Sequence, residues 1–489
     1  MSKIVHNIME NMDAKYEAFP YQHEAFMAIR DLDYAAIFHE QGLGKTKIAI
    51  DLLLYWLQKR DIDCVMIVTK KTLVANWVRE FATHTNLRPE VLTNNRGNNF
   101  YVLNGQSRVV ITNFETVSGE KDRLCLFLKT RNVAIIIDES TKIKNPEAKL
   151  TLDFFELSEL FKIRVIMTGT PVANRPYDIW AQIYFLDGGA TLGKDFAEFK
   201  HDGDLSNKLN KDDIRRETFE TTVSSIYKRI SEFTVRETKN CGIISLPQKH
   251  YHPEVVSFTL TQAKMYETVK EEMAIDVVKS GDVITDESPE AIKRLLRLVQ
   301  ITSNPALIDE SYKETSAKEK HLDKLIKRII DSGEQAIIWS IFTDNIDYFC
   351  RKYKELGAVK ITGKMGVEER NKSVVKFKNG SARLLFATPQ SAKEGLTLTE
   401  ANHAIFYDRG FNLDDYLQAQ DRIHRISQKK DCHIYNLMVA DSIDIWIDQL
   451  LEAKQRAAYL AQGDITVAEY KETPDYSFAE LVRNILKTN

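Results

Sequence analysis

Several features that define other classes of protein are scarce in this sequence. Its 489 residues include only five cysteines, and these are scattered along the chain, at Cys64, Cys125, Cys241, Cys350 and Cys432. This spacing excludes a disulfide framework and a zinc-ligand pattern, so we expect free thiols in a reducing compartment, the cytoplasm. No apolar run approaches the length of a membrane span, and the N-terminus lacks a signal-peptide core, so we expect no membrane partner.

An excess of basic charge is also absent. The chain has 67 Lys and Arg residues against 70 Asp and Glu residues, which gives a net charge of −3. The overall charge therefore gives no sign of nucleic-acid binding, and any such contact must come from a local basic surface. The hydrophobic content of 43% is that of a globular protein, and the length suffices for two or three domains.

Short apolar runs rich in β-branched residues alternate with helical patterns in two parts of the chain. Between residue 16 and about 185 the expected strands are 36–38, 65–68, 109–111, 134–137 and 165–167. From about residue 320 the expected strands are 336–339, 359–361, 384–387, 404–407 and 433–437. Continuous apolar strands separated by helices predict a parallel sheet covered on both faces, so we expect two α/β units of the same class.

The segment between these two parts, residues 187–320, is charged and helical and shows no parallel-sheet pattern. Residues 262–273 and 291–300 are expected to form helices, and 246–249 to form a short linker. The second helix carries three basic residues on one face, which fits either a solvated surface or phosphate contacts: Lys293, Arg294 and Arg297. The expected domains are 1–245 with a helical insertion at about 187–240, a linker and protrusion at 246–320, a second lobe at 321–455 and a helical tail at 456–489.

One stretch, His-Glu-Gln-Gly-Leu-Gly-Lys-Thr at residues 39–46, lies between an apolar run and a helical pattern. A strand, a glycine turn and a helix together form the context of a phosphate-binding loop, because the backbone N–H groups and the helix dipole attract an anion. In such a loop Lys45 reaches the β- and γ-phosphates and Thr46 holds Mg²⁺. The full pattern has glycine where His39 stands, and the alternative is a chance glycine turn before a helix.

Two carboxylates follow the apolar run 135–137, at Asp138 and Glu139. Ligands bind at the carboxyl ends of parallel strands, where these residues, the loop 39–46 and the polar segment 168–170 should meet. Asp138 suits Mg²⁺, which prefers oxygen ligands, and Glu139 can orient and deprotonate an attacking water. The alternative is an acidic pair without a catalytic role.

Arg422 and Arg425 lie three residues apart in the segment 418–428, so on a helix they would share one face. A phosphoryl-transfer site uses arginine to neutralise charge in the transition state. The alternative is a solvated basic helix.

Together these motifs resemble the ATPases of helicase superfamily two, and specifically the Swi/Snf-related branch. The matching segments run from about residue 16 to 450 in the order typical of the family, and they resemble the compact bacterial, viral or fork-remodelling members. The first lobe contributes 19–22, 40–46, 65–77, 111–115, 138–145, 168–171 and 174–176, and the second contributes 337–340, 361–363 with 368–370, 395–399 and 418–428.

The resemblance implies two RecA-like parallel-sheet lobes with helical protrusions between them, and ATP with Mg²⁺ bound between the lobes. The implied nucleotide contacts are Tyr21, Gln22, Gly42, Leu43, Gly44, Lys45, Thr46, Gly395 and Gln418, with Gln22 on the adenine base. Arg422 and Arg425 complete the catalytic set of Lys45, Asp138 and Glu139. The implied nucleic-acid contacts are Lys70, Thr112, Asn113, Thr170 and Lys393.

The sequence departs from the family pattern at four residues. Thr141 replaces the usual histidine of the acidic motif, Ala392 and Lys393 replace a common glycine pair, and Ser427 replaces a glycine near the arginines. None of these changes removes a group that hydrolysis needs.

The resulting hypothesis is a monomeric, ATP-driven motor that tracks double-stranded or branched DNA. A strand-separating DNA or RNA helicase would use the same ATPase machinery. A slowly hydrolysing, nucleotide-dependent scaffold protein is an alternative of another class, against which the complete catalytic set argues.

Overall fold

The structure is a computed structural model that describes residues 11–204, 212–239, 246–280, 289–391 and 396–471. It divides into two compact units. The first unit contains residues 11–204, 218–239 and 458–466, and the second contains 212–217, the described part of 245–457, and 467–471.

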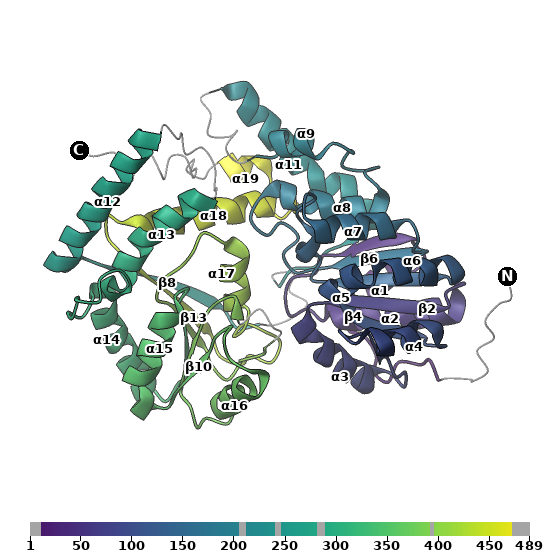
Figure 1. Cartoon of the computed structure of the whole chain (residues 1–489), viewed down its shortest axis with the longest axis horizontal. Coiled ribbons are helices and arrows are strands. Elements are labelled where there is room, and N and C mark those ends of the chain that lie inside the picture. The colour runs from purple at the N-terminus through teal and green to yellow at the C-terminus, as the bar shows by residue number, and fades with distance from the viewer. Residues whose placement is uncertain (1–10, 205–211, 240–245, 281–288, 392–395, 472–489) are drawn as a thin grey trace. The chain divides into compact units, whose positions relative to one another are not determined.

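The first unit is built on a seven-stranded sheet with the strand order β3-β4-β2-β5-β6-β1-β7, in which every pairing is parallel. Its strands are β1 (Tyr34–Ile37), β2 (Cys64–Thr69), β3 (Glu90–Val91), β4 (Val109–Asn113), β5 (Val133–Asp138), β6 (Ile163–Met167) and β7 (Thr234–Val235). Helices lie on both sides of this sheet (Figure 1): α1 (Pro20–Ile29), α2 (Lys45–Lys59), α3 (Val74–His84), α4 (Arg96–Asn104), α5 (Phe114–Gly119), α6 (Lys121–Thr130), α7 (Lys149–Ser158), α8 (Trp180–Asp187), α9 (Phe196–Asp202) and α11 (Asp213–Ile230).

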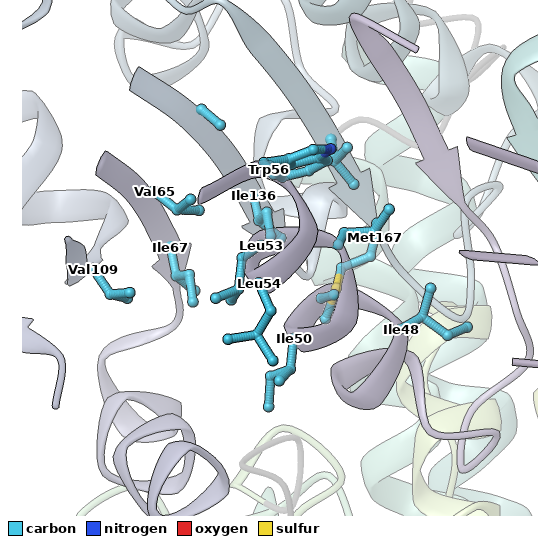
Figure 2. Packing of buried hydrophobic residues seen from close by; sticks show 14 of the residues in the cluster. Ile48, Ile50, Leu53, Leu54, Trp56, Val65, Ile67, Val109, Ile136 and Met167 are labelled. Atoms are coloured by element: carbon cyan, nitrogen blue, oxygen red, sulfur yellow. The ribbon is translucent and has the colours of Figure 1, made fainter. Parts of the chain in front are cut away.

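Helix α2 places the phosphate-loop candidate rigidly against the sheet. Its apolar side chains, including Leu53 and Trp56, pack on strand residues such as Ile67, Ile136 and Met167 (Figure 2). Burial of each large apolar side chain contributes about 1.5–3 kcal/mol, so the start of α2 is held by a core that extends across five strands.

The second unit has a six-stranded parallel sheet with the order β10-β11-β9-β12-β13-β8. Its strands are β8 (Lys249–Val256), β9 (Ala336–Trp339), β10 (Ala358–Ile361), β11 (Leu384–Ala387), β12 (His403–Phe406) and β13 (Cys432–Val439). The helices are α12 (Leu260–Ser280), α13 (Pro289–Ser303), α14 (Ala317–Asp331), α15 (Thr343–Lys352), α16 (Val367–Lys378), α17 (Leu413–Gln420), α18 (Ile443–Ala461) and α19 (Val467–Lys471). Helices α14 and α15 pack in one apolar cluster with the sheet, and α16 and α17 pack in another.

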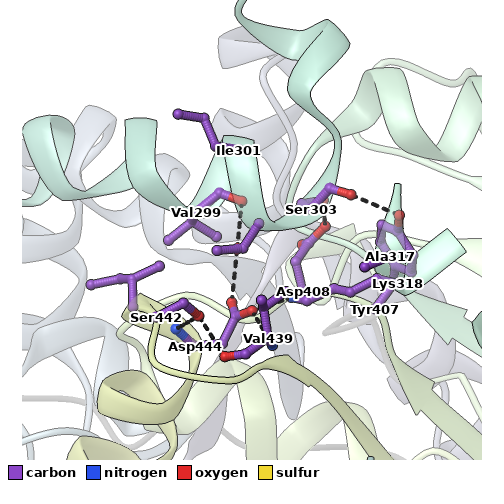
Figure 3. A network of polar contacts seen from close by, with 12 residues as sticks. Val299, Ile301, Ser303, Ala317, Lys318, Tyr407, Asp408, Val439, Ser442 and Asp444 are labelled. Atoms are coloured by element: carbon purple, nitrogen blue, oxygen red, sulfur yellow. Dashed lines mark hydrogen bonds and ion pairs between the residues drawn. The ribbon is translucent and has the colours of Figure 1, made fainter. Parts of the chain in front are cut away.

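A buried polar network attaches the helical protrusion α12–α13 to this second sheet (Figure 3). The Asp408 carboxylate accepts hydrogen bonds from the Ser303 and Ser340 hydroxyls, both at 2.7 Å, and burial raises its pKa. The fully buried Lys318 ammonium lies 2.7 Å from Asp444 Oδ2. The Thr302 hydroxyl on α13 donates to Asp444 Oδ1 at 3.0 Å, so the end of α13, the starts of α14 and α18, and the carboxyl ends of β9 and β12 form one connected group.

The prediction of two parallel-sheet α/β units is confirmed, and the expected strands agree with the observed ones to within one or two residues at each end. The prediction that 187–320 contains no parallel strand is wrong, since β7 joins the first sheet and β8 joins the second. Strand β8 has an edge position, and its exposed and half-buried side chains alternate. It therefore lacks the continuous apolar run of an interior strand. The expected linker at 246–249 is shorter, because Lys249 already begins β8.

Two other predictions concern cysteines and membrane spans. The four described cysteines, Cys64, Cys125, Cys350 and Cys432, are free, and Cys241 lies outside the described residues. Among the helices that the structure describes, none combines the length and the apolar character needed to cross a bilayer.

Candidate nucleotide-hydrolysis site

The loop between β1 and α2 has the backbone shape of a phosphate-binding loop. Gly42 and Gly44 have φ angles of +88° and +71°, in the left-handed region that favours glycine. A Cβ atom on Gly44 would lie 2.2 Å from Gln22 Nε2, so a side chain at this position would displace the Gln22 amide. The φ angle of His39 is not positive, so this position accepts a residue other than glycine.

Lys45 is the first residue of α2, and its side chain folds back over the loop. Its ammonium donates hydrogen bonds to the carbonyl oxygens of His39 at 2.9 Å and Glu40 at 3.3 Å. Thr46 follows in the first helical turn, where the backbone N–H groups and the helix dipole create positive potential. A phosphate placed at this helix start would meet Lys45 and Thr46 together.

His39 is neutral at physiological pH. Its imidazole is buried, and burial together with the positive charges of Lys45 and Arg236 lowers its pKa to about 4. Arg236 also donates to the Phe38 carbonyl at 3.0 Å and pairs with Asp464, with 2.5 Å between Nη2 and Oδ2. Arg236, which directly follows β7, therefore holds the backbone at the start of the loop in place.

Tyr21 and Gln22 brace the same loop from helix α1. The Tyr21 hydroxyl and the Gln22 amide nitrogen donate to the Leu43 carbonyl, at 3.0 and 3.3 Å, and both side chains are buried. The Gln22 amide oxygen accepts the backbone N–H of Phe19 at 3.0 Å. Recognition of adenine by Gln22 stays a prediction, and the structure adds a supporting role for the phosphate loop.

Asp138 is the last residue of β5, and its carboxylate is held by two donors from neighbouring elements. Trp77 Nε1 on α3 and Thr69 Oγ1 at the end of β2 donate to Asp138 Oδ2, at 2.9 and 3.1 Å. Burial, followed by the negative charge of Glu139, raises the pKa of Asp138 to about 6. A bound cation would stabilise the ionised form of such an enclosed carboxylate.

Glu139 has a φ angle of +60°, which is unusual for a residue with a side chain. Lys70 Nζ lies 3.5 Å from Glu139 Oε2. Asp138 and Glu139 therefore have different partners, since Thr69 and Trp77 donate to Asp138 while Lys70 lies beside Glu139.

The donors present fit Mg²⁺. The hydroxyl of Thr46 and the carboxylate of Asp138 are hard oxygen ligands, and both residues lie at the carboxyl edge of the first sheet. When bound, the metal ion would polarise the phosphate oxygens and neutralise charge on them. Within the described residues, no group of three or more histidine, cysteine or acidic side chains forms a separate metal site.

The loop after β6 packs directly on the phosphate loop. A Cβ atom on Gly169 would lie 2.6 Å from Gln41 Cγ and 3.0 Å from Gln41 N. The Thr170 backbone N–H donates to the Thr168 hydroxyl at 3.2 Å. The structure therefore brings together the three polar segments that the sequence placed at one sheet edge.

The predicted nucleic-acid contacts have different environments. Lys70 lies beside Glu139, Thr112 is fully buried, and the Asn113 side chain caps α5 by accepting the Thr116 N–H at 3.0 Å. Thr170 is 8% exposed, and Lys393 lies outside the described residues. Contact with DNA stays a prediction for all five residues.

In the second unit, the expectation that Arg422 and Arg425 share a helix face is wrong, because α17 ends at Gln420 and both arginines lie in the turns that follow. Arg422 is 2% exposed and donates to the carbonyls of Gln418 at 3.1 Å and Leu396 at 3.3 Å. Arg425 donates to Thr397 Oγ1 at 2.7 Å. The alternative of a solvated basic helix is therefore also wrong.

The Gln428 side chain stabilises this turn by donating to the Ala401 and Ile423 carbonyls, both at 2.9 Å. Gln418 is buried and donates to Asp414 Oδ1 at 2.7 Å, whereas Gly395 lies outside the described residues. The second unit thus presents its two arginines from an ordered loop rather than from a helix.

From the sequence, Trp77 and Thr69 were not connected with Asp138. Both lie in the segment 65–77, one of the segments that carry the family resemblance. Thr69 could have been found, because it is a polar residue at the end of β2, and β2 pairs with the strand β5 that ends in Asp138. Trp77 carries no comparable local signal.

A phosphate loop with an acidic pair at the same sheet edge is the arrangement of a nucleotide-hydrolysing protein. Comparison with known families is specific: residues 21–307 match the SNF2-related domain, and residues 317–427 match the helicase conserved C-terminal domain. The first match covers more than half of the chain, which belongs to the SNF2-related domain family.

Individual relatives are distant. The ISWI chromatin-remodeling complex ATPase ISW2 of Saccharomyces cerevisiae is 27% identical over 433 residues, covering 83% of this chain and 37% of the relative. An uncharacterized ATP-dependent helicase of Mycoplasma pneumoniae is 26% identical, covering 89% of this chain and 41% of the relative. The chain thus spans less than half the length of these curated relatives. The solved Sulfolobus solfataricus SWI2/SNF2 ATPase core in complex with dsDNA is 24% identical, with 98% of each chain covered and a TM-score of 0.43.

Proposed function

We propose that this chain is an ATP-dependent motor that moves along double-stranded DNA. The observation that carries the proposal is the convergence of the phosphate loop and the acidic pair at one sheet edge. That edge lies in a chain that matches both the SNF2-related and the helicase C-terminal domains. The ATPases among its relatives support the same reaction class.

In this proposal Lys45 and the N–H groups of residues 42–46 bind the phosphates, while Thr46 and Asp138 hold Mg²⁺. Glu139 orients the attacking water and accepts its proton. Trp77 and Thr69 keep the Asp138 carboxylate in one orientation through the hydrogen bonds at 2.9 and 3.1 Å.

Arg422 and Arg425 of the second unit supply positive charge to the transferring phosphoryl group. Gly395 and Gln418 contribute further nucleotide contacts in this unit. Tyr21 and Gln22 recognise the base from the first unit. Groups from both units are therefore needed for turnover, so that nucleotide binding and release can drive motion.

The motor moves on duplex DNA in this proposal. Because the net charge of the chain is −3, local contacts bind the DNA. Lys70, Thr112, Asn113, Thr170 and Lys393 are the candidate contacts. The basic face of α13 offers a further surface, since Lys293 and Arg297 are exposed.

The steady-state ATPase rate should discriminate between the candidate functions. Duplex DNA is expected to stimulate hydrolysis more than single-stranded DNA or RNA of equal phosphate content, and chelation of Mg²⁺ should abolish it. Stimulation should fall steeply with salt, because phosphate contacts release counterions. Stimulation mainly by single strands would favour the helicase, and a slow rate indifferent to all three nucleic acids would favour the scaffold protein.

A further inference from the structure

A single buried amide connects two segments of the proposed hydrolysis site. Gln182 lies on α8 and is fully buried. Its amide oxygen accepts a hydrogen bond from the Ser140 hydroxyl at 2.7 Å, and its amide nitrogen donates to the carbonyls of Pro171 at 2.8 Å and Asp178 at 2.9 Å. Ser140 follows Glu139 directly, and Pro171 ends the loop 168–171 that packs on the phosphate loop.

The backbone at Glu139 needs external support. In the left-handed region the Cβ atom of a residue with a side chain crowds the following carbonyl oxygen, so this conformation is less stable than the right-handed one. The turn after Glu139 is closed by the hydrogen bond from Lys142 N–H to its carbonyl at 3.0 Å. The fully buried Ser140 side chain anchors this turn to Gln182.

A second connection runs parallel to the first. The Lys144 ammonium donates to Asp178 Oδ2 at 2.9 Å, and the same oxygen accepts the backbone N–H groups of Asn174 at 3.0 Å and Arg175 at 3.3 Å. Residues 140–144 and 171–178 are therefore joined at both ends. This pair of segments can move only as a unit unless the Gln182 or Asp178 contacts break.

We propose that Gln182 is a positioning residue for hydrolysis, which fixes Glu139 relative to the loop 168–171 through Ser140. This inference rests on the proposed role of Glu139 as the residue that orients water. Gln182 itself is buried behind these segments, and its effect on the reaction passes through Ser140. Displacement of a catalytic group by about 1 Å can reduce a rate by two orders of magnitude, so loss of this link should be visible in turnover.

The test compares Gln182→Leu, Ser140→Ala and the double variant in the full chain, with duplex DNA present. Each single change is expected to lower kcat by about ten- to a hundredfold, while the KM for ATP and the affinity for a fluorescent ATP analogue change by less than about twofold. Because both changes remove the same hydrogen bond, the double variant should be no slower than the slower single variant.

Asn99→Ala provides the matched control. Asn99 is another fully buried amide of the first unit, bonded to Thr93 and Glu120 outside the proposed site. It should lower the melting temperature without the selective loss of kcat. If Gln182→Leu does not fold, Ser140→Ala still removes the link with a smaller change.

Three results would overturn the role of Gln182. They are a parental kcat in Ser140→Ala, losses of kcat that multiply in the double variant, and a rise in the KM for ATP as large as the fall in kcat. These outcomes are distinct from failure of the proposed function. An inactive parent chain, or a Glu139→Gln variant with parental activity, would instead contradict the site assignment on which the inference rests.

Discussion

Glu139→Gln is expected to bind ATP with parental affinity and to hydrolyse it about a hundred- to ten-thousandfold more slowly. The amide keeps the size of the carboxylate, so the turn with φ of +60° should persist, but it cannot accept the proton of water. Single-turnover hydrolysis and equilibrium binding of radiolabelled ATP in the full chain would measure the two effects separately.

Lys45→Ala is the matched comparison for this variant. It removes the ammonium that lies over the phosphate loop, so ATP binding itself should be lost. A Glu139→Gln protein that hydrolyses ATP at nearly the parental rate would show that another residue activates the water.

Arg425→Ala is expected to reduce kcat by about a thousandfold or more while ATP binding in the full chain changes little. Its guanidinium is half-buried and bonded to Thr397, and it would stabilise charge that develops only during phosphoryl transfer. The measurement is kcat at saturating ATP and duplex DNA, together with the ATP dissociation constant.

Lys429→Ala is a suitable control, because Lys429 is an exposed cation directly after the segment 418–428, and its loss should leave kcat unchanged. Arg422→Ala should also reduce kcat, but it removes a donor from the Gln418 and Leu396 carbonyls, so a stability loss of about 1–3 kcal/mol should accompany it. Loss of ATP binding by Arg425→Ala with an unchanged kcat would contradict the assignment.

The interior of both sheets could be predicted because its signal is local. Strands β9 and β11 coincide with the expected residues, since each is a continuous apolar run that is buried on both faces. Strand β8 was missed for the opposite reason. It lies at a sheet edge, and exposed residues such as Tyr251 and Val255 alternate with half-buried ones.

Within the candidate site, local motifs identified the loop around Lys45 and the acidic pair Asp138–Glu139. The residues that support them could not be found in this way, because their partners are distant in sequence. Trp77 is 61 residues from Asp138, and Gln182 is 42 residues from Ser140. The loop that carries Arg422 and Arg425 shows another limit. A spacing of three residues favours a shared helix face, but α17 ends at Gln420, before either arginine.

The most direct test of the proposed motor is displacement of a triplex-forming strand from duplex DNA. A motor that tracks the duplex should release the third strand in an ATP-dependent reaction and leave the two duplex strands paired. Glu139→Gln should fail to release it. Efficient unwinding of a plain forked duplex, without displacement of the third strand from an intact duplex, would contradict the account and favour a strand-separating helicase.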